Sequence, residues 1–281
     1  IMQNNASGTS CETGQMYMVI MPGRYKLTVK YYVKDKDTNV SGAITKTFGE
    51  FTYAPNGYYD MPATLSIRSY GDDYYMWDAK QEYWYGHKAD QPKIEKVPGT
   101  NFPTSSDADR WYNAATFPTA ASNKAKDCPN INELFWYCKK GDPHWDNTTL
   151  WSVWGHLYTG GIWLKKASVI AQENSKTTAY LKTASPDDGQ NRANKKVFET
   201  PPSQAVTQGT PSKLNDYFFL PAMGRYAGGK LFYFRTCGDY WTSTPYPYNS
   251  KISYNLHFDN GTLTVSNTSN WENGYKLWKT E

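Results

Sequence analysis

The sequence predicts an α+β protein in which an N-terminal antiparallel β-sheet, residues 1–73, precedes a larger mixed domain, residues 74–281. Its 281 residues are about what two domains require. All eleven tryptophans lie between Trp77 and Trp278, so composition changes sharply near Gly71. Aromatic residues make up 16% of the chain, which excludes disorder because so many large apolar side chains favour a packed core.

The N-terminal region carries the alternation that is typical of β-strands. Over residues 24–35 every second side chain is apolar, with Lys and Thr between them: Tyr25, Leu27, Val29, Tyr31 and Val33. Residues 15–21, 43–53 and 63–70 are further predicted strands. Four strands make one sheet, whereas a β-sandwich normally needs about seven. We therefore expect part of a sandwich, whose other strands are missing or come from a partner chain.

The clearest helix prediction covers residues 131–140. Asn130 occupies the N-cap position and Glu133 follows three residues later, a close variant of the capping box. Apolar residues recur at helical spacing and two lysines end the segment, where they complement the helix dipole. Gly141 is expected to adopt the left-handed conformation that ends many helices.

The segments after this helix are predicted to alternate between helix, strand and loop. Residues 147–154 are expected to form a second helix, capped by Asp146 and stopped by Gly155. Residues 160–164 read as a short buried strand. Residues 174–216 are polar and rich in Ser, Thr, Pro, Asn and Asp, and we expect a long, partly mobile excursion.

The last sixty residues return to strands. Strands are predicted at 218–220, 252–258 and 275–279. Residues 259–261, Asp-Asn-Gly, should close a tight hairpin, since Asn-Gly tolerates the positive φ of a type I′ turn. Helices flanked by antiparallel strands are an α+β arrangement.

Several motifs resemble those of a known family. The segments FLPAMGRY (219–226), GDYWTSTP (238–245) and CPNINEL (128–134) are similar to motifs of the Fibrobacter-succinogenes major paralogous domain. That resemblance covers residues 74–281 and implies a C-type-lectin-like fold. Residues 15–54, especially PGRYKLTV (22–29), resemble a fimbrillin-type β-sandwich of Bacteroidetes surface proteins. Together the two resemblances imply a fimbrial or pilus-tip-like adhesin.

The residues that commonly carry catalysis or bind metal do not form a known pattern. The four histidines lack metal-ligand spacing, and no nucleophile elbow or phosphate-binding glycine loop occurs. Cys237 is expected to be a small buried packing residue, and Cys128 and Cys138 are too far apart along a helix to bridge. Asp187, Asp188 and Asn191 could surround Ca²⁺, but a solvated acidic loop is the favoured interpretation. We expect no catalytic residue, no metal and no cofactor.

A ligand-binding surface is predicted instead. It lies in two loops, one after the strand that contains Trp241 and one before the last predicted strand. Pro245 and Pro247 stiffen one of these loops and lower the entropy cost of ordering it. The candidate binding residues are rings and amides: Tyr246, Tyr248, Asn249, Asn270, Trp271 and Asn273. Trp241 is expected in the core, and for Trp271 core and surface are left open.

These observations predict a non-enzymatic protein at the cell surface, outer membrane or fimbrium. It would bind a host or microbial glycan or protein, and could accept a strand from another pilin subunit. The charge of +4 is too balanced to indicate a nucleic-acid partner, and no apolar run is long enough for a transmembrane helix. Two alternatives remain open: a secreted enzyme on the same fold, and a purely structural fimbrial stalk component.

Overall fold

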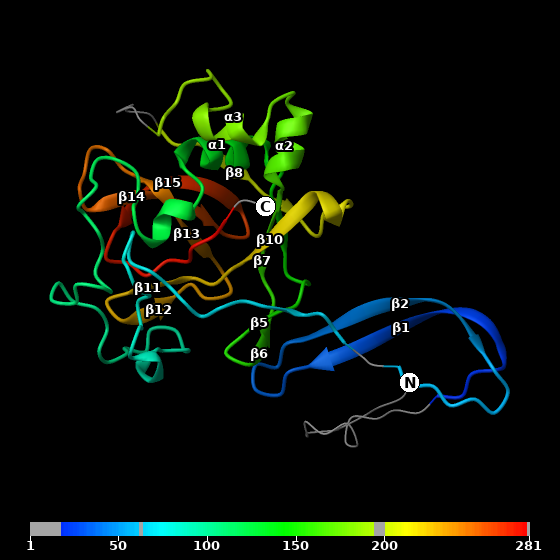
Figure 1. Ribbon diagram of the computed structural model, residues 1–281. Coiled ribbons are helices and arrows are strands. Elements are labelled where there is room, and N and C mark those ends of the chain that lie inside the picture. Colours follow the sequence, from blue (N-terminus) through cyan, green and yellow to red (C-terminus); the bar gives the residue numbers. More distant parts are fainter. Residues whose placement is uncertain (1–17, 62–63, 194–199, 280–281) are drawn as a thin grey trace. The chain divides into compact units, whose positions relative to one another are not determined.

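The computed structural model describes residues 18–61, 64–193 and 200–279, and contacts divide the chain into two units (Figure 1). We call Ile1–Lys34 with Ser41–Ser66 the hairpin unit. Asp35–Val40 with Ile67–Glu281 form the main unit. The sequence suggested a boundary at 73, whereas the contacts change at Ser66, and the turn at 35–40 belongs to the main unit.

The hairpin unit contains two antiparallel strands, β1 (Gly23–Lys34) and β2 (Ser41–Tyr53). Both were predicted and both are confirmed. One face is half-buried, at Leu27, Val29, Tyr31 and Val33 in β1, while the side chains between them are exposed. The four-stranded sheet is wrong for the described residues, because 18–21 form no strand and only Arg68–Ser69 of the predicted 63–70 does. Residues 15–17 lie outside the described residues.

Among the described residues, the main unit holds all the helices and most of the strands. Its strands are β3 (Arg68–Ser69), β4 (His144–Asp146), β5 (Trp151–Val153), β6 (His156–Tyr158), β7 (Gly161–Lys165), β8 (Ser203–Ala205), β9 (Thr207–Gln208), β10 (Tyr217–Pro221), β11 (Arg225–Ala227), β12 (Lys230–Phe232), β13 (Gly238–Pro245), β14 (Ile252–Phe258) and β15 (Thr262–Asn270). Its α-helices are α1 (Ile131–Lys140), α2 (Ala167–Glu173) and α3 (Thr178–Thr183). Short 3₁₀ turns lie at Lys88–Asp90, Lys124–Asp127 and Leu214–Asp216.

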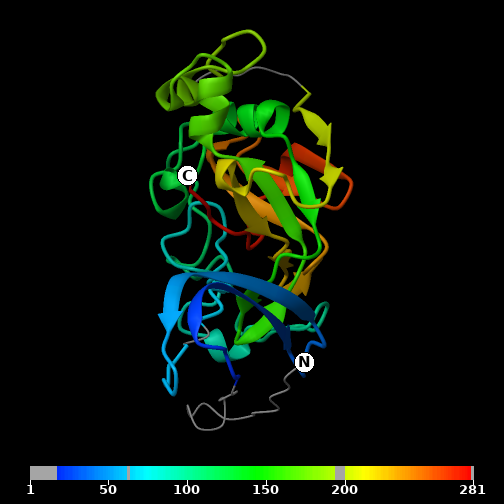
Figure 2. The same cartoon turned by 90° about the vertical axis from the view of Figure 1, so that its right-hand side faces the viewer.

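Two four-stranded sheets organise the main unit, in the orders β10-β7-β4-β9 and β13-β14-β15-β8. One smaller sheet pairs β11 with β12, and another has the strand order β3-β5-β6. The helices gather at one end, and β5 and β6 lie at the other, in both views (Figures 1 and 2). With 35% strand and 13% helix in several sheets, the chain is β-rich and consistent with the α+β class.

The core of the main unit is unusually aromatic. One cluster joins α1 to strands of both large sheets, and Leu134, Ile162 and Leu256 are fully buried members of it. Two further clusters are built mainly from rings, and in one of them Trp77 stacks on Trp271 with centroids 4.5 Å apart. Offset ring pairs of this kind stabilise a core beyond their burial alone.

Helix α1 confirms its prediction, including the capping box between Asn130 and Glu133. The expected left-handed Gly141 is wrong, since its φ is −77° and Asp142 takes the positive φ of 46° instead. Glycine is required at 141 for a different reason. A Cβ there would lie 2.2 Å from the Tyr137 carbonyl oxygen.

The helix predicted at 147–154 is wrong, because this segment forms a turn followed by β5. Trp154 and Gly155 both have positive φ, and they form the turn that joins β5 to β6. Asp146 caps no helix. Its carboxylate instead accepts hydrogen bonds from the backbone N–H and hydroxyl groups of Thr148 and Thr149. These bonds stabilise the turn between β4 and β5.

The strands predicted at 160–164, 218–220 and 252–258 are confirmed as β7, β10 and β14. Residues 275–279 form only isolated bridges, so the strand predicted there is wrong. The β14–β15 hairpin is confirmed, but its type I′ turn is wrong because neither Asn260 nor Gly261 has positive φ. The Asp259 carboxylate holds this turn by accepting from the N–H groups of Gly261 and Thr262, each at 2.8 Å. The excursion at 174–216 contains α3 and β8.

Candidate functional site

The loop between β13 and β14 presents one aromatic ring and holds another beneath it. The Tyr246 N–H donates to the Ile252 carbonyl at 3.1 Å, and the Asn249 N–H donates to the Tyr246 carbonyl at 3.2 Å. The half-buried Tyr246 ring packs on Tyr254, with centroids 5.5 Å apart. Tyr248 is 47% exposed, and its ring centroid lies 5.6 Å from that of Tyr246. Tyr246 therefore supports the loop, and Tyr248 is its exposed ring.

Amide side chains lie beside this loop because β15 ends next to it. Asn270 is the cross-strand partner of Ile252, and it is exposed. Within the described part of the chain its side-chain amide makes no hydrogen bond. Asn249 is also exposed, and its Oδ1 accepts from the Lys251 N–H at 3.0 Å. Asn273 is half-buried, and its amide donates to the Tyr275 hydroxyl at 3.4 Å.

We call these residues the loop surface: Tyr246, Tyr248, Asn249, Asn270 and Asn273. The sequence grouped them from two separate loops, and the pairing of Ile252 with Asn270 places those loops side by side. The exposed Tyr248 ring and the exposed amides of Asn249 and Asn270 can form stacking contacts and hydrogen bonds with a ligand.

Trp271 must be removed from the predicted binding residues, because its side chain is fully buried. Asn270 faces out, and the next residue turns inward to stack on Trp77 with Tyr112 and Phe117 at its edges. The backbone N–H of Trp271 donates to the Lys251 carbonyl at 2.9 Å. Trp271 thus fixes the loop surface from beneath. Trp241 is fully buried as expected, and it stacks on Tyr275 at 4.1 Å.

A largely buried polar network joins strands β13, β14 and β15. The Asp239 carboxylate accepts from Arg225 at 3.0 Å, from His257 Nδ1 at 2.8 Å and from Asn255 at 3.1 Å. Hydrogen bonds then continue through a chain of side chains: Asn255, Ser269, Tyr275 and Asn273. Burial alone would lower the pKa of His257, but the hydrogen bond and charge of Asp239 outweigh it and raise that pKa. The network links Asn273 to a fixed scaffold.

The cysteines do not have the properties of a nucleophile. Burial raises the pKa of Cys128 and of Cys138 to about 12. Burial also raises the pKa of Cys237, and the nearby Asp239 and Asp259 add to the effect. A reactive thiol needs a lowered pKa. These three cysteines, the ones that the structure describes, are free thiols, and Cys237 is only half-buried.

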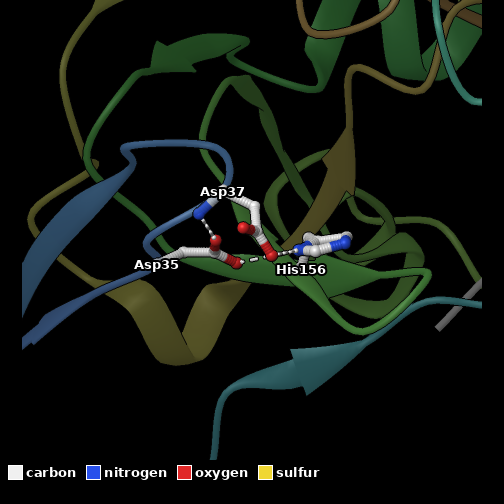
Figure 3. A group of neighbouring side chains, drawn as sticks. All are labelled: Asp35, Asp37 and His156. Carbon is white, nitrogen blue, oxygen red and sulfur yellow. Dashed lines mark hydrogen bonds and ion pairs between the residues drawn. The ribbon is translucent and has the colours of Figure 1, made fainter. Parts of the chain in front are cut away.

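The structure also brings together Asp35, Asp37 and His156, which the sequence analysis missed (Figure 3). One potential ligand atom from each lies within 4.8 Å of the others. The Asp35 carboxylate already accepts from three backbone N–H groups: Leu157 at 2.8 Å, Asp37 at 2.9 Å and Thr38 at 3.1 Å. These bonds, that of Leu157 first, lower the pKa of Asp35 to about 2. The group is therefore best explained as an anchor for the turn at 35–40.

No sequence signal joins these residues, since Asp35 and His156 are 121 positions apart. The acidic loop considered for Ca²⁺ is also accounted for. Asp187 pairs with Lys139, and Asp188 pairs with Arg192 at 2.8 Å, so the two carboxylates serve separate cations. Asn191 accepts from the Asn132 amide at 3.0 Å.

No family model, curated protein or solved structure matches this chain. The family resemblances therefore stay predictions, and function has to be argued from the geometry. None of the described helices is long and apolar enough to cross a bilayer.

Proposed function

We propose that this protein is a cell-surface adhesin or pilus-tip-like subunit, whose main unit is a C-type-lectin-like domain that binds a host or microbial glycan. The observation that supports binding is the Tyr248 ring, exposed and backed by Tyr246, beside the exposed amides of Asn249 and Asn270. A ring can stack on the C–H face of a sugar while amides bond its hydroxyl groups, with no metal required.

The rigidity of the loop supports the same function. Pro245 and Pro247 fix two φ angles, and hydrogen bonds from Tyr246 and Asn249 close the turn, so little entropy is lost when a ligand orders it. A protein epitope could use the same ring and amides. Exposed rings also lie outside the loop surface, for example Tyr85 and Tyr32, so a binding measurement and not exposure separates an adhesin from a stalk component.

A glycan array tests the proposal with the full chain. Tyr248→Ala should weaken binding about five- to thirtyfold, since an aromatic anchor contributes about 1–2 kcal/mol. Asn270→Ala should give a smaller loss. Tyr85→Ala is the matched control, because Tyr85 is also about half exposed (54%) but lies outside the loop surface. Binding by Tyr248→Ala that equals wild type would overturn this site, as would equal loss in Tyr85→Ala.

For the hairpin unit we propose strand addition from another pilin-type subunit. Two strands alone are marginally stable, and the half-buried face at Val29 and Tyr31 has no further strand of its unit over it within the described residues. Both strands also keep one open edge, where an added strand can pair.

Sedimentation as a function of concentration tests this second proposal. The wild-type chain should self-associate, and Val29→Lys on the apolar face should weaken association. Thr45→Lys, on the exposed side of β2, is the control and should associate like wild type. A wild-type chain that stays monomeric at all concentrations would contradict strand addition between copies of this chain.

A further inference from the structure

A cleft lies in the main unit, beside strand β10. Its volume is about 210 Å³, and it shares no residue with the loop surface. In the part of the chain that the structure describes, β10 is the outer strand of its sheet and pairs with β7 alone (Figure 1). The other walls are formed by Arg68, Tyr70, Tyr240 and residues 276–279. Pockets for drug-sized ligands are roughly 300 Å³ or larger, so this cleft is suited to a single ring.

Two tyrosine hydroxyls fix the walls of the cleft on β10. The Tyr70 hydroxyl donates to the Phe219 carbonyl at 3.2 Å, and the Tyr240 hydroxyl donates to the Pro221 carbonyl at 2.7 Å. The Trp278 indole donates to the Trp241 carbonyl at 3.0 Å. The aromatic lining is therefore preorganised, with its polar atoms already bonded to the backbone.

The charged residues that line the cleft are all cations: Arg68, Lys276 and Lys279. Arg68 and Lys279 are exposed. Lys279 forms a loose ion pair with Asp127 at 3.5 Å, and both side chains are more than half exposed. Such pairs are weak, so a ligand can compete for this ammonium group.

Lys276 is the unusual cation, because its side chain is buried (8% exposed) without an acidic partner. Its ammonium donates to the carbonyl oxygens of Gly71 at 2.7 Å and Asp73 at 2.6 Å, and lies 4.8 Å from the Tyr74 ring. Across the described residues no carboxylate oxygen lies within 4.0 Å of it. Burial lowers the pKa of Lys276 to about 8, so the group is still charged at neutral pH.

Asp73 and Asp72 favour the charged form of Lys276 without forming an ion pair with it, and both pair with another lysine. Lys88 pairs with Asp72 at 3.0 Å and with Asp73 at 2.7 Å. The buried charge of Lys276 is therefore only partly compensated, and an anion in the cleft would stabilise it further.

We propose that this cleft binds a cyclic monocarboxylate of one-ring size. The carboxylate would lie toward Lys276, with Arg68 and Lys279 at the entrance, and the ring would pack among Tyr70, Tyr240 and Trp278. Two sources have this chemistry, an acidic sugar unit of a glycan and a free aromatic acid. The proposal goes beyond glycan binding at the loop surface and does not depend on it.

The test is a titration of the full chain with four probes, followed by protein NMR. Glucuronate and N-acetylneuraminate represent acidic sugars, benzoate represents aromatic acids, and glucose is the neutral probe. At least one carboxylate should shift the signals of Tyr70 and Trp278, and glucose should not. The carboxylate that binds tighter identifies the source. No binding by any carboxylate at about 10 mM overturns the proposal, as does equal binding of glucose.

Variants make the charge argument specific. Arg68→Gln with Lys279→Gln changes only exposed side chains and should raise the Kd about tenfold, because each removes a charged hydrogen-bond donor. Lys276→Met keeps the length of the side chain and should raise the Kd further. Lys213→Gln, an exposed lysine outside the cleft, is the control. An unchanged Kd in the Arg68 and Lys279 variant overturns the proposal. Tyr248→Ala should leave the Kd unchanged, which separates this site from the loop surface.

Discussion

The hairpin unit and the main unit are built from the same alternating strand pattern, yet they differ in how that pattern is covered. Val29 in β1 is only half-buried, whereas Val265 in β15 is 1% exposed. Strand β15 lies in a four-stranded sheet that packs against α1, whereas among the described strands β1 pairs with β2 alone. Alternation therefore determines that a segment is a strand, and the layer packed over it determines how much it stabilises the fold.

The largest expected effect is in the aromatic core of the main unit. Trp271→Ala should lower the free energy of unfolding by about 4 kcal/mol, because it removes a fully buried ring stacked on Trp77. Tyr32→Ala in the hairpin unit removes a ring that is 72% exposed. It should change the free energy of unfolding by less than about 0.5 kcal/mol. Denaturant unfolding measures both. Similar losses in the two variants would contradict the contrast between the units.

A buried carboxylate gives the next effect. Asp78 is fully buried and accepts from the backbone N–H groups of Ser122 at 2.8 Å and Asn123 at 2.7 Å, and from the Asn113 amide at 2.7 Å. Asp78→Ala leaves these donors unpaired and should lower the free energy of unfolding by about 3 kcal/mol. Asp109→Ala, in an exposed ion pair with Lys80, should have almost no effect. A loss below about 1 kcal/mol at Asp78 would show that water replaces the carboxylate.

Acid should weaken the main unit through Asp146. Burial opposes its charge, but bonds from Thr148, Thr149 and Trp163 outweigh burial and lower the pKa of Asp146 to about 2. The unfolded value is higher, near 3.9, so this stabilisation is complete above about pH 4 and is lost as the pH falls toward 2. It amounts to about 2 kcal/mol. Asp146→Asn should be less stable at pH 6 and lose less stability between pH 4 and 2, as thermal unfolding across that range would show.

The predictable parts of the fold are those with a local cause. Helix α1 carries its own cap at Asn130, and β1 and β14 carry their own alternation, so each was predicted from a few neighbouring residues. The segment at 147–154 was predicted wrongly because the Asp146 bonds and the positive φ of Trp154 depend on a turn geometry that resembles a helix start.

The candidate site was predictable only in part, for the same reason. Proline spacing and ring content pointed to Tyr248 and Asn249, which are exposed. The orientation of Trp271 depends on Trp77, which lies 194 positions earlier in the chain. The Asp35–His156 contact and the cleft on β10 likewise bring together residues distant in sequence, and no local pattern encodes them.

The smallest expected effect is that of truncating a half-buried valine in the hairpin unit. Set beside a fully buried valine, it compares the two units most directly. Val265→Ala should lower the free energy of unfolding by about 2 kcal/mol, since it removes fully buried carbon atoms. Val29→Ala removes the same atoms from a half-covered face and should cost roughly half as much or less. If a partner strand covers that face after assembly, the cost of Val29→Ala should rise toward that of Val265→Ala in the assembled protein and stay small in the monomer. Equal costs in the monomer would mean that the face of β1 is already covered, and strand addition would lose its support.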